Sequence, residues 1–160
     1  MKPVISAIAL LMFLATSQMS SAKSNIFPAG IPGVPGEITV NNVNIKAVRD
    51  FARLYRNIDN AKWYTTNKGY SASFDLNGKN IKVVYDINGM RQYSIISYTE
   101  KYLAFEIRDL VKRNFYDHNI IGVHQFEFEN DKTVYVIKMT DAHSNAMTLK
   151  VYDGQIEVIN

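Results

Sequence analysis

The sequence contains no cysteine among its 160 residues. This absence excludes a disulfide framework, a thiol nucleophile and a lipid-modified N-terminal cysteine. The chain is long enough to bury a hydrophobic core, and without cross-links that core alone must hold the fold together.

The sequence is also poor in patterns that bind metals, cofactors or nucleotides. Its three histidines show no metal-ligand spacing, and it has no glycine-rich phosphate-binding motif. His118 and His143 closely follow Asp117 and Asp141, and an aspartate can orient an imidazole for general-base catalysis. No motif places a nucleophile beside either pair, so we interpret both as solvated loop histidines. We expect no catalytic, cofactor-binding or metal site.

An excess of one charge is missing as well. Lys2 lies in an apolar leader, which leaves 17 of the 18 basic residues against 15 acidic residues. The two signs alternate along the chain and form no basic stripe, so nucleic acid is not an expected partner.

Long hydrophobic runs are confined to the N-terminus. Residues 4–15 are almost wholly apolar, and residues 20–22 are the small residues that a signal peptidase reads. The run is shorter than the roughly 20 apolar residues of a membrane span. We predict a cleaved signal peptide over residues 1–22 and an exported bacterial protein, periplasmic or extracellular, with no membrane span in the mature chain.

Proline is rare outside one segment. Three of the four prolines alternate with glycines between residues 28 and 36. This composition favours an extended linker, which we predict over residues 23–43. A short edge strand near residues 38–40 is the alternative.

The remaining residues, 44–160, show the pattern of a single α+β domain. Apolar residues recur at helical spacing over residues 44–55, with Asn44 as a plausible N-cap, and again over residues 99–115. Alternating runs predict antiparallel strands at residues 61–65, 70–76, 81–87, 90–98, 120–129, 133–140, 146–152 and 155–159. We expect the helices to pack on one face of this sheet and Trp63 to belong to the core. His124 is in phase with Phe126 and Phe128, so we expect it to be a partly buried core residue.

Two Asp-x-Asn-Gly phrases, at residues 75–78 and 86–89, could begin calcium loops or form tight turns. An EF-hand loop needs glycine at its sixth position and glutamate at its twelfth, and neither phrase meets both conditions. Asn-Gly between two alternating runs is instead typical of a hairpin with a two-residue turn. We predict two such turns and no calcium site.

These turns predict which side chains share a face of the sheet. They place Phe74 opposite Ile81 under the helices, and Asp86 opposite Arg91 on the open face. A two-residue turn at Asp153-Gly154 would likewise pair Lys150 with Glu157. Tyrosine and arginine on a rigid sheet are typical interface anchors. The candidate partner-binding face consists of Lys82, Val84, Asp86, Arg91, Tyr93, Lys150, Tyr152 and Glu157. An ordinary solvated face is the alternative, because a one-residue slip would exchange the two faces.

The two halves of the domain resemble each other. Residues 48–51 (Val-Arg-Asp-Phe) are echoed by residues 107–110 (Ile-Arg-Asp-Leu), and residues 84–86 (Val-Tyr-Asp) recur at residues 151–153. The pattern predicts a tandem repeat of one helix plus an antiparallel meander, over about residues 44–98 and 99–160. Chance similarity between short amphipathic segments is the alternative.

A set of aromatic and turn residues also stands in the order and approximate spacing of a known family. The set comprises Phe51, Trp63, Gly69-Tyr70, Phe74, Asn77-Gly78, Tyr85-Asp86 and Asn88-Gly89. Over about residues 44–160 the chain resembles the PepSY-like family, small exported bacterial proteins similar to the beta-lactamase inhibitor protein. It departs from the family at Tyr55-Arg56 and Leu103-Ala104, where proline is frequent. The resemblance implies the tandem fold and no catalytic residues, and beta-lactamase inhibition is only an analogy of fold.

The sequence therefore predicts a non-catalytic exported module that binds a protein or peptide through its open sheet face, with inhibition of the partner as one outcome. The alternative is a small-ligand binder or minor enzyme with a pocket between the helices and a curled sheet, lined by some of the ten tyrosines. A third possibility is an envelope structural protein. An exposed aromatic cluster would favour the protein binder, and a pocket around His124 would favour the ligand binder. The sequence leaves the oligomeric state open.

Overall fold

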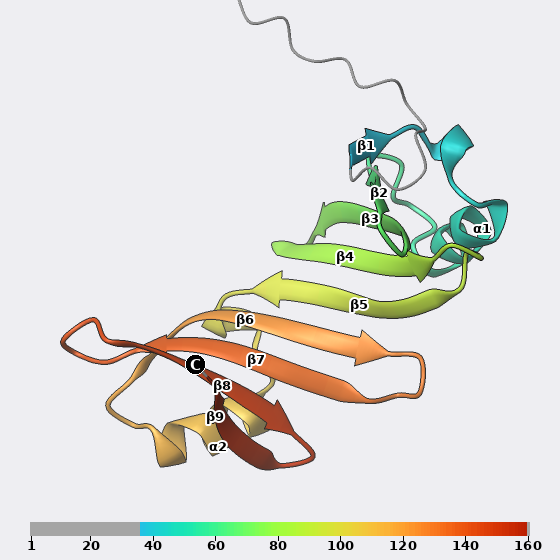
Figure 1. Ribbon diagram of the computed structural model, residues 1–160. Coiled ribbons are helices and arrows are strands. Elements are labelled where there is room, and N and C mark those ends of the chain that lie inside the picture. The colour runs from blue at the N-terminus through green and yellow to red at the C-terminus, as the bar shows by residue number, and fades with distance from the viewer. Residues whose placement is uncertain (1–35, 160) are drawn as a thin grey trace, which may run out of the picture.

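The computed structural model describes residues 36–159 and has an α+β fold with one antiparallel sheet (Figure 1). Its nine strands follow one another across the sheet in chain order. They are β1 (Gly36–Ile38), β2 (Lys62–Thr66), β3 (Gly69–Leu76), β4 (Lys79–Asp86), β5 (Arg91–Tyr98), β6 (Asn119–Phe128), β7 (Thr133–Thr140), β8 (Ala146–Tyr152) and β9 (Gln155–Ile159). The helices are α1 (Ile45–Leu54) and α2 (Phe105–Asn114). The predicted signal peptide lies outside the described residues.

The end of the predicted linker is part of the folded domain. Residues 36–38 form β1, which pairs with β2, and a 3-10 turn follows at Val40–Asn42. Ile38 and Val43 are buried in the core around α1. The linker prediction is therefore wrong for residues 36–43. The nearby glycines and prolines are typical of a linker, but burial of these two apolar side chains stabilises the segment against the rest of the domain.

Helix α1 begins where the sequence predicts. The Asn44 side chain accepts a hydrogen bond from the Lys46 N–H at 3.0 Å, as an N-cap does. Ala47 and Phe51 on its buried face pack against β2, β3 and β4. The Phe51 ring lies 5.3 Å from the Trp63 ring, which confirms that Trp63 belongs to this core.

The second helix is shorter than the predicted 99–115. A 3-10 turn covers Glu100–Tyr102, and then Leu103 and Ala104 adopt extended backbone with ψ of 133° and 139°. This break lets Leu103 turn into the core that Val111 forms with β6, β7 and β8. Helical periodicity continues across the break in the sequence, so the pattern could not reveal it.

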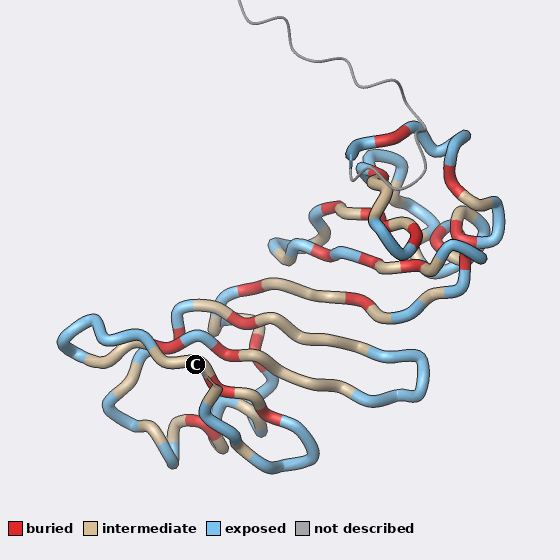
Figure 2. Tube along the Cα trace, viewed as in Figure 1, coloured by how far each residue is buried: buried red, intermediate tan, exposed pale blue. Residues whose placement is uncertain are grey.

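The order of elements is the same in both halves of the sheet. A 3-10 turn, a ten-residue helix and four strands run from residue 40 to 98, and the same order runs from residue 100 to 159. The helices lie at opposite ends of the sheet, with β5 and β6 between them (Figure 1). Figure 2 shows two groups of buried residues, one at each end, separated by strands that are mostly half-buried.

The two Asn-Gly turns differ from each other. At the first, Asn77 and Gly78 have φ of 51° and 75°, and Phe74 pairs with Ile81, so the predicted two-residue turn is confirmed. At the second, the Asp86 N–H donates to the Met90 carbonyl at 2.9 Å, which closes a three-residue turn over residues 87–89. The prediction of a two-residue turn is wrong there, because contact with the start of α1 shapes this loop.

That contact is specific. The Asn44 amide donates to the Ile87 carbonyl at 3.2 Å, and a Cβ on Gly89 would lie 2.9 Å from the backbone nitrogen of Ala47. Gly89 has φ of +80° and fills the space that no side chain could occupy. The start of α1 is thereby attached to the β4–β5 turn.

Candidate functional site

Alternation along β4 defines two faces of the sheet. Ile81, Val83 and Tyr85 are buried in the core with α1, so Lys82 and Val84 between them point to the opposite side. We call that opposite side the open face. Cross-strand pairing extends it across the sheet, because directly paired residues share a face.

Apolar side chains form a stripe across the middle of the open face. Val84 pairs with Tyr93, Tyr93 with Phe128, and Phe126 with Val134. The Tyr93 ring lies 5.9 Å from the Phe128 ring and 6.3 Å from the Phe126 ring. We call the following residues the aromatic stripe: Val84, Tyr93, Phe126, Phe128, Val134 and Tyr152. Each remains partly exposed, and Phe128 and Tyr152 reach 37% and 38% exposure.

The stripe lies in a depression rather than on a flat surface. A hollow of about 720 Å³ is lined by residues that include Val84, Tyr93 and Phe128. A second hollow of about 250 Å³ shares Phe128 and adds Val134 and Tyr152, and a third of about 280 Å³ shares Tyr152. We call these three connected hollows the open-face groove.

Seven of the eight residues predicted for the partner-binding face line this groove. Four of them line the largest hollow, namely Lys82, Val84, Asp86 and Tyr93. Three line the smaller hollows, namely Lys150, Tyr152 and Glu157. The predicted pairing of Lys150 with Glu157 is confirmed, with an ion pair of 2.7 Å between Nζ and Oε2.

Arg91 is the exception, and its predicted place opposite Asp86 is wrong. The register shifts between Val84 and Tyr85, so Tyr85 pairs with Arg91 and one extra residue enters β5. Arg91 consequently points toward α1, where its Nε lies 3.7 Å from Oδ2 of Asp50. Because the turn has three residues instead of two, the side chain at the start of β5 points to the opposite face from the one predicted.

Arg91 belongs to a polar group at the edge of the α1 core. The Tyr85 hydroxyl donates to Oδ2 of Asp50 at 3.3 Å, and Arg53 pairs with Oδ1 at 2.7 Å. Burial, followed by the nearby Asp50 carboxylate, raises the pKa of Tyr85 far above its usual value. The group therefore keeps Tyr85 neutral and attaches α1 to β4 and β5.

The sequence prediction missed Phe126, Phe128 and Val134. The prediction that His124 is a core residue rests on its phase with Phe126 and Phe128. The structure puts His124 on the open face instead, where Nδ1 lies 2.8 Å from the Ser97 hydroxyl. Val123, next to His124 in β6, is buried in the core, so strand alternation places His124 on the opposite face.

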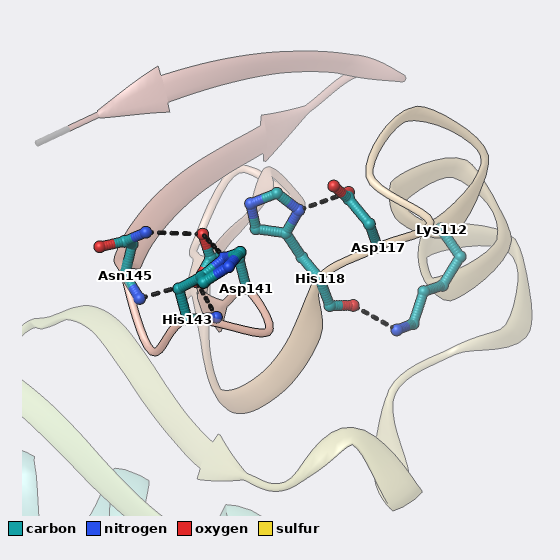
Figure 3. Close-up of polar contacts among 6 residues, drawn as sticks. All are labelled: Lys112, Asp117, His118, Asp141, His143 and Asn145. Atoms are coloured by element: carbon teal, nitrogen blue, oxygen red, sulfur yellow. Dashed lines mark hydrogen bonds and ion pairs between the residues drawn. The ribbon is translucent and has the colours of Figure 1, made fainter.

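Figure 3 shows the two Asp–His pairs near each other, one between α2 and β6 and the other in the β7–β8 loop. Nδ1 of His118 is 2.7 Å from Oδ1 of Asp117, and the Lys112 ammonium donates to the His118 carbonyl. His143 has an 87% exposed side chain and lies 3.9 Å from Oδ2 of Asp141. Within residues 36–159 no group of three or more potential ligands could hold a metal ion.

Asp141 organises the β7–β8 loop through backbone contacts. Its Oδ1 accepts from the N–H groups of His143 and Asn145, both at 2.8 Å, and its Oδ2 accepts from the Asn145 amide at 2.7 Å (Figure 3). The Asn145 side chain, then its backbone N–H, lowers the pKa of Asp141. The arrangement is that of a loop closed by an aspartate.

This loop is expected to loosen in acid. A carboxylate with a lowered folded pKa stabilises the fold fully above its usual pKa of about 3.9, and the contribution is lost as the pH falls through the lowered value. We expect the Asn145 amide resonance to shift at acidic pH in an NMR titration. Asp141→Asn should abolish that transition, and the same transition in the variant would contradict the assignment.

No helix within residues 36–159 has the length and apolar character needed to cross a membrane. No family model matches the sequence, and no curated protein matches it either.

Several solved structures resemble the fold. A DUF2874 family protein from Bacteroides ovatus is 15% identical with a TM-score of 0.60, and the match covers 71% of this chain and 85% of that one. A BLIP-like protein from Bacteroides fragilis is 16% identical with a TM-score of 0.60, over 74% of this chain and 84% of that one. A protein from Bacteroides eggerthii, provisionally described as periplasmic, is 12% identical with a TM-score of 0.60, over 73% and 89%.

At these identities the likeness concerns the fold alone. It agrees with the resemblance to the beta-lactamase inhibitor protein that the sequence indicates, since one of the three structures is BLIP-like. None of the three is described as PepSY-like.

Proposed function

We propose that this protein is an exported, non-catalytic module that binds another protein through its open face. The aromatic stripe is the observation that carries the proposal. Contiguous apolar surface of this kind, rimmed by polar residues, is costly to expose and marks interaction sites. Tyrosine and phenylalanine also offer a large contact area with few rotatable bonds to order on binding.

The geometry supports a protein partner over a small ligand. The predicted ligand pocket would lie between the helices and the sheet, with His124 and tyrosines in its walls. The hollow of about 400 Å³ beside α1 is lined by Tyr55 and Trp63 but not by His124. The hollow of about 720 Å³ lies on the opposite side of the sheet and shares Phe128 with the adjoining hollow of the open-face groove. A groove made of adjoining hollows suits an extended partner surface, whereas small ligands are usually enclosed in one pocket.

We further infer that the domain is a tandem repeat whose two helices pack on the same face. The repeated order of elements supports the duplication. Val83 of the α1 core pairs with Ser94 on β5. Four residues along the same strand, Tyr98 pairs with Val123, which pairs with Ile137 of the α2 core. Alternation places Ser94 and Tyr98 on one face of β5, so the two cores lie on the same side of the sheet. With both helices on that side, the other face stays free for a partner.

Export is supported by the predicted signal peptide and by the periplasmic description of one structural neighbour. A BLIP-like neighbour makes inhibition of an enzyme a reasonable outcome of binding. The partner need not be a beta-lactamase, because function on a shared fold depends on the site.

The proposal predicts that loss of the stripe abolishes partner capture. We expect the tagged chain to retain a specific protein from its native envelope extract, and the Tyr93→Ala/Phe128→Ala variant to bind that protein at least about tenfold more weakly. Mass spectrometry identifies the captured protein, and titration calorimetry with the purified partner measures the difference.

The matched control is Phe105→Ala/Tyr116→Ala, which removes one phenylalanine and one tyrosine that are 72% and 85% exposed outside the stripe. Binding should be unchanged in this control, and all three chains should show the same thermal transition. Equal capture by both variants, or a saturable turnover that disappears when His118 or His143 is changed, would refute the proposal.

A further inference from the structure

We infer that the open-face groove receives an extended acidic segment of the partner protein, with a large apolar side chain placed between carboxylates. This inference rests on the proposed function and specifies the chemistry of the partner. It follows from the charges around the aromatic stripe, from the position of Phe128, and from the amides that line the hollows.

The charges of the groove are predominantly positive. Its lining includes Lys68, Lys82, Lys132 and Lys150, against the two carboxylates Asp86 and Glu157. Glu157 already pairs with Lys150, and Oδ1 of Asp86 accepts from the Met90 N–H of its own turn at 2.8 Å. Within residues 36–159 the other three lysines make no ion pair, and all three are exposed.

The lysines stand on both sides of the apolar centre. Phe128 lines the largest hollow together with Lys68 and Lys82, and it lines the adjoining hollow together with Lys132 and Lys150. If a bound segment places an apolar side chain against Phe128, the residues on both sides of that side chain therefore lie near lysines. Carboxylates at those flanking positions would pair with the lysines that make no ion pair within residues 36–159.

The dimensions fit a short extended peptide. From β4, which carries Lys82, to β8, which carries Lys150, there are four strand-to-strand steps of about 4.8 Å, or roughly 19 Å. An extended chain advances about 3.3 Å per residue, so about six residues would span the groove. Such a peptide would cross the strands and lie along the stripe.

The lining also favours a peptide over a nucleic acid, the other polymer that combines negative charge with flat apolar groups. Asn67, Gln92 and Asn130 line the hollows and offer amide donors and acceptors that suit a peptide backbone.

The test uses fluorescence anisotropy with the purified full chain and three labelled probes. The first is a synthetic peptide of about eight residues that alternates glutamate with leucine or tyrosine, long enough to span the groove. The second replaces every glutamate with glutamine, and the third is an oligothymidylate. We expect the acidic peptide to bind at least about tenfold more tightly than either of the others, and to weaken as salt screens the charges.

Charge-reversal variants assign the effect to the groove. Lys82→Glu/Lys132→Glu should weaken binding of the acidic peptide by at least about tenfold. The control Lys62→Glu/Lys138→Glu makes the same change in net charge at two exposed strand lysines that line none of the three hollows, and it should bind within about twofold of the parent. Equal affinity for the acidic and glutamine peptides, preferential binding of the oligothymidylate, or equal weakening by both variants would overturn the inference.

The capture experiment separates this inference from the proposed function. A native partner lost from Tyr93→Ala/Phe128→Ala but retained by Lys82→Glu/Lys132→Glu would keep the open face as the binding surface and reject the acidic segment. A partner retained by both double variants would reject the face itself.

Discussion

Replacing Phe51 by alanine is expected to destabilise the domain by about 3 to 5 kcal/mol. Phe51 is 5% exposed, and its ring contacts those of Tyr55, Trp63 and Phe74 at centroid distances of 5.3, 5.3 and 5.4 Å. The substitution removes the ring at the centre of this cluster and leaves a cavity that three rigid aromatic neighbours cannot fill. Domains of this size have a total stability of about 5 to 15 kcal/mol, so the loss approaches global unfolding.

Urea denaturation followed by tryptophan fluorescence measures this loss directly, because Trp63 is the single tryptophan and lies beside the site of the change. The control is Phe105→Ala on α2, where the side chain is 72% exposed. We expect its effect to stay within about 0.5 kcal/mol. If Phe51→Ala costs no more than this control, the aromatic cluster does not hold α1 on the sheet.

Local sequence patterns predict most of the strands because strand alternation and turn chemistry act over a few residues. The hairpin at Asn77-Gly78 shows this, since both turn residues adopt the positive φ that the dipeptide favours. The pairing of Phe74 with Ile81 and of Lys150 with Glu157 then follows from the turns. The core position of Phe51 follows in the same way from helical periodicity.

The errors arise where a contact from a distant part of the chain decides the local structure. The α1 start shapes the Asn88-Gly89 loop through Asn44, and the bulge in β5 then moves Arg91 to the other face. Leu103 leaves the helical path to reach the second core. None of these contacts is visible in the local pattern, because each joins residues that are far apart in sequence or depends on shape.

The candidate site was predicted only in part, both in its charged residues and in its apolar residues. Lys82 and Lys150 were assigned to the open face by alternation, and they line the groove. Phe126 and Phe128 were not, because an aromatic residue in a strand is ordinarily interpreted as core. Two phenylalanines on the same face as the exposed groove lysines depart from the rule that aromatic residues of a strand belong to the core. Such a departure is typical of a binding surface.

Gly69→Ala is expected to distort this groove as well as destabilise the fold. Gly69 has φ of +149°, and a Cβ there would lie 2.2 Å from the Tyr85 carbonyl oxygen and 2.4 Å from the carbonyl carbon of Asp86. Both contacts are with backbone, so β3 and β4 must separate locally to admit even one methyl group. We expect a cost on the order of 3 kcal/mol, from backbone strain together with the lost strand pairing.

The functional consequence follows from the position of Gly69 beside the largest hollow. Lys68, which precedes Gly69, and Asp86, its partner on β4, both line that hollow, so a local separation of β3 and β4 displaces both lining residues. We therefore expect Gly69→Ala to weaken binding of the acidic peptide even at temperatures where the variant remains folded.

Gly122→Ala is the matched control, because a Cβ at Gly122 meets nothing within 4 Å and the strand position favours a side chain. A Gly69→Ala chain that retained parental stability would contradict the close approach of β3 to β4. A destabilised variant that still bound the peptide with parental affinity would instead place the binding site away from this hollow.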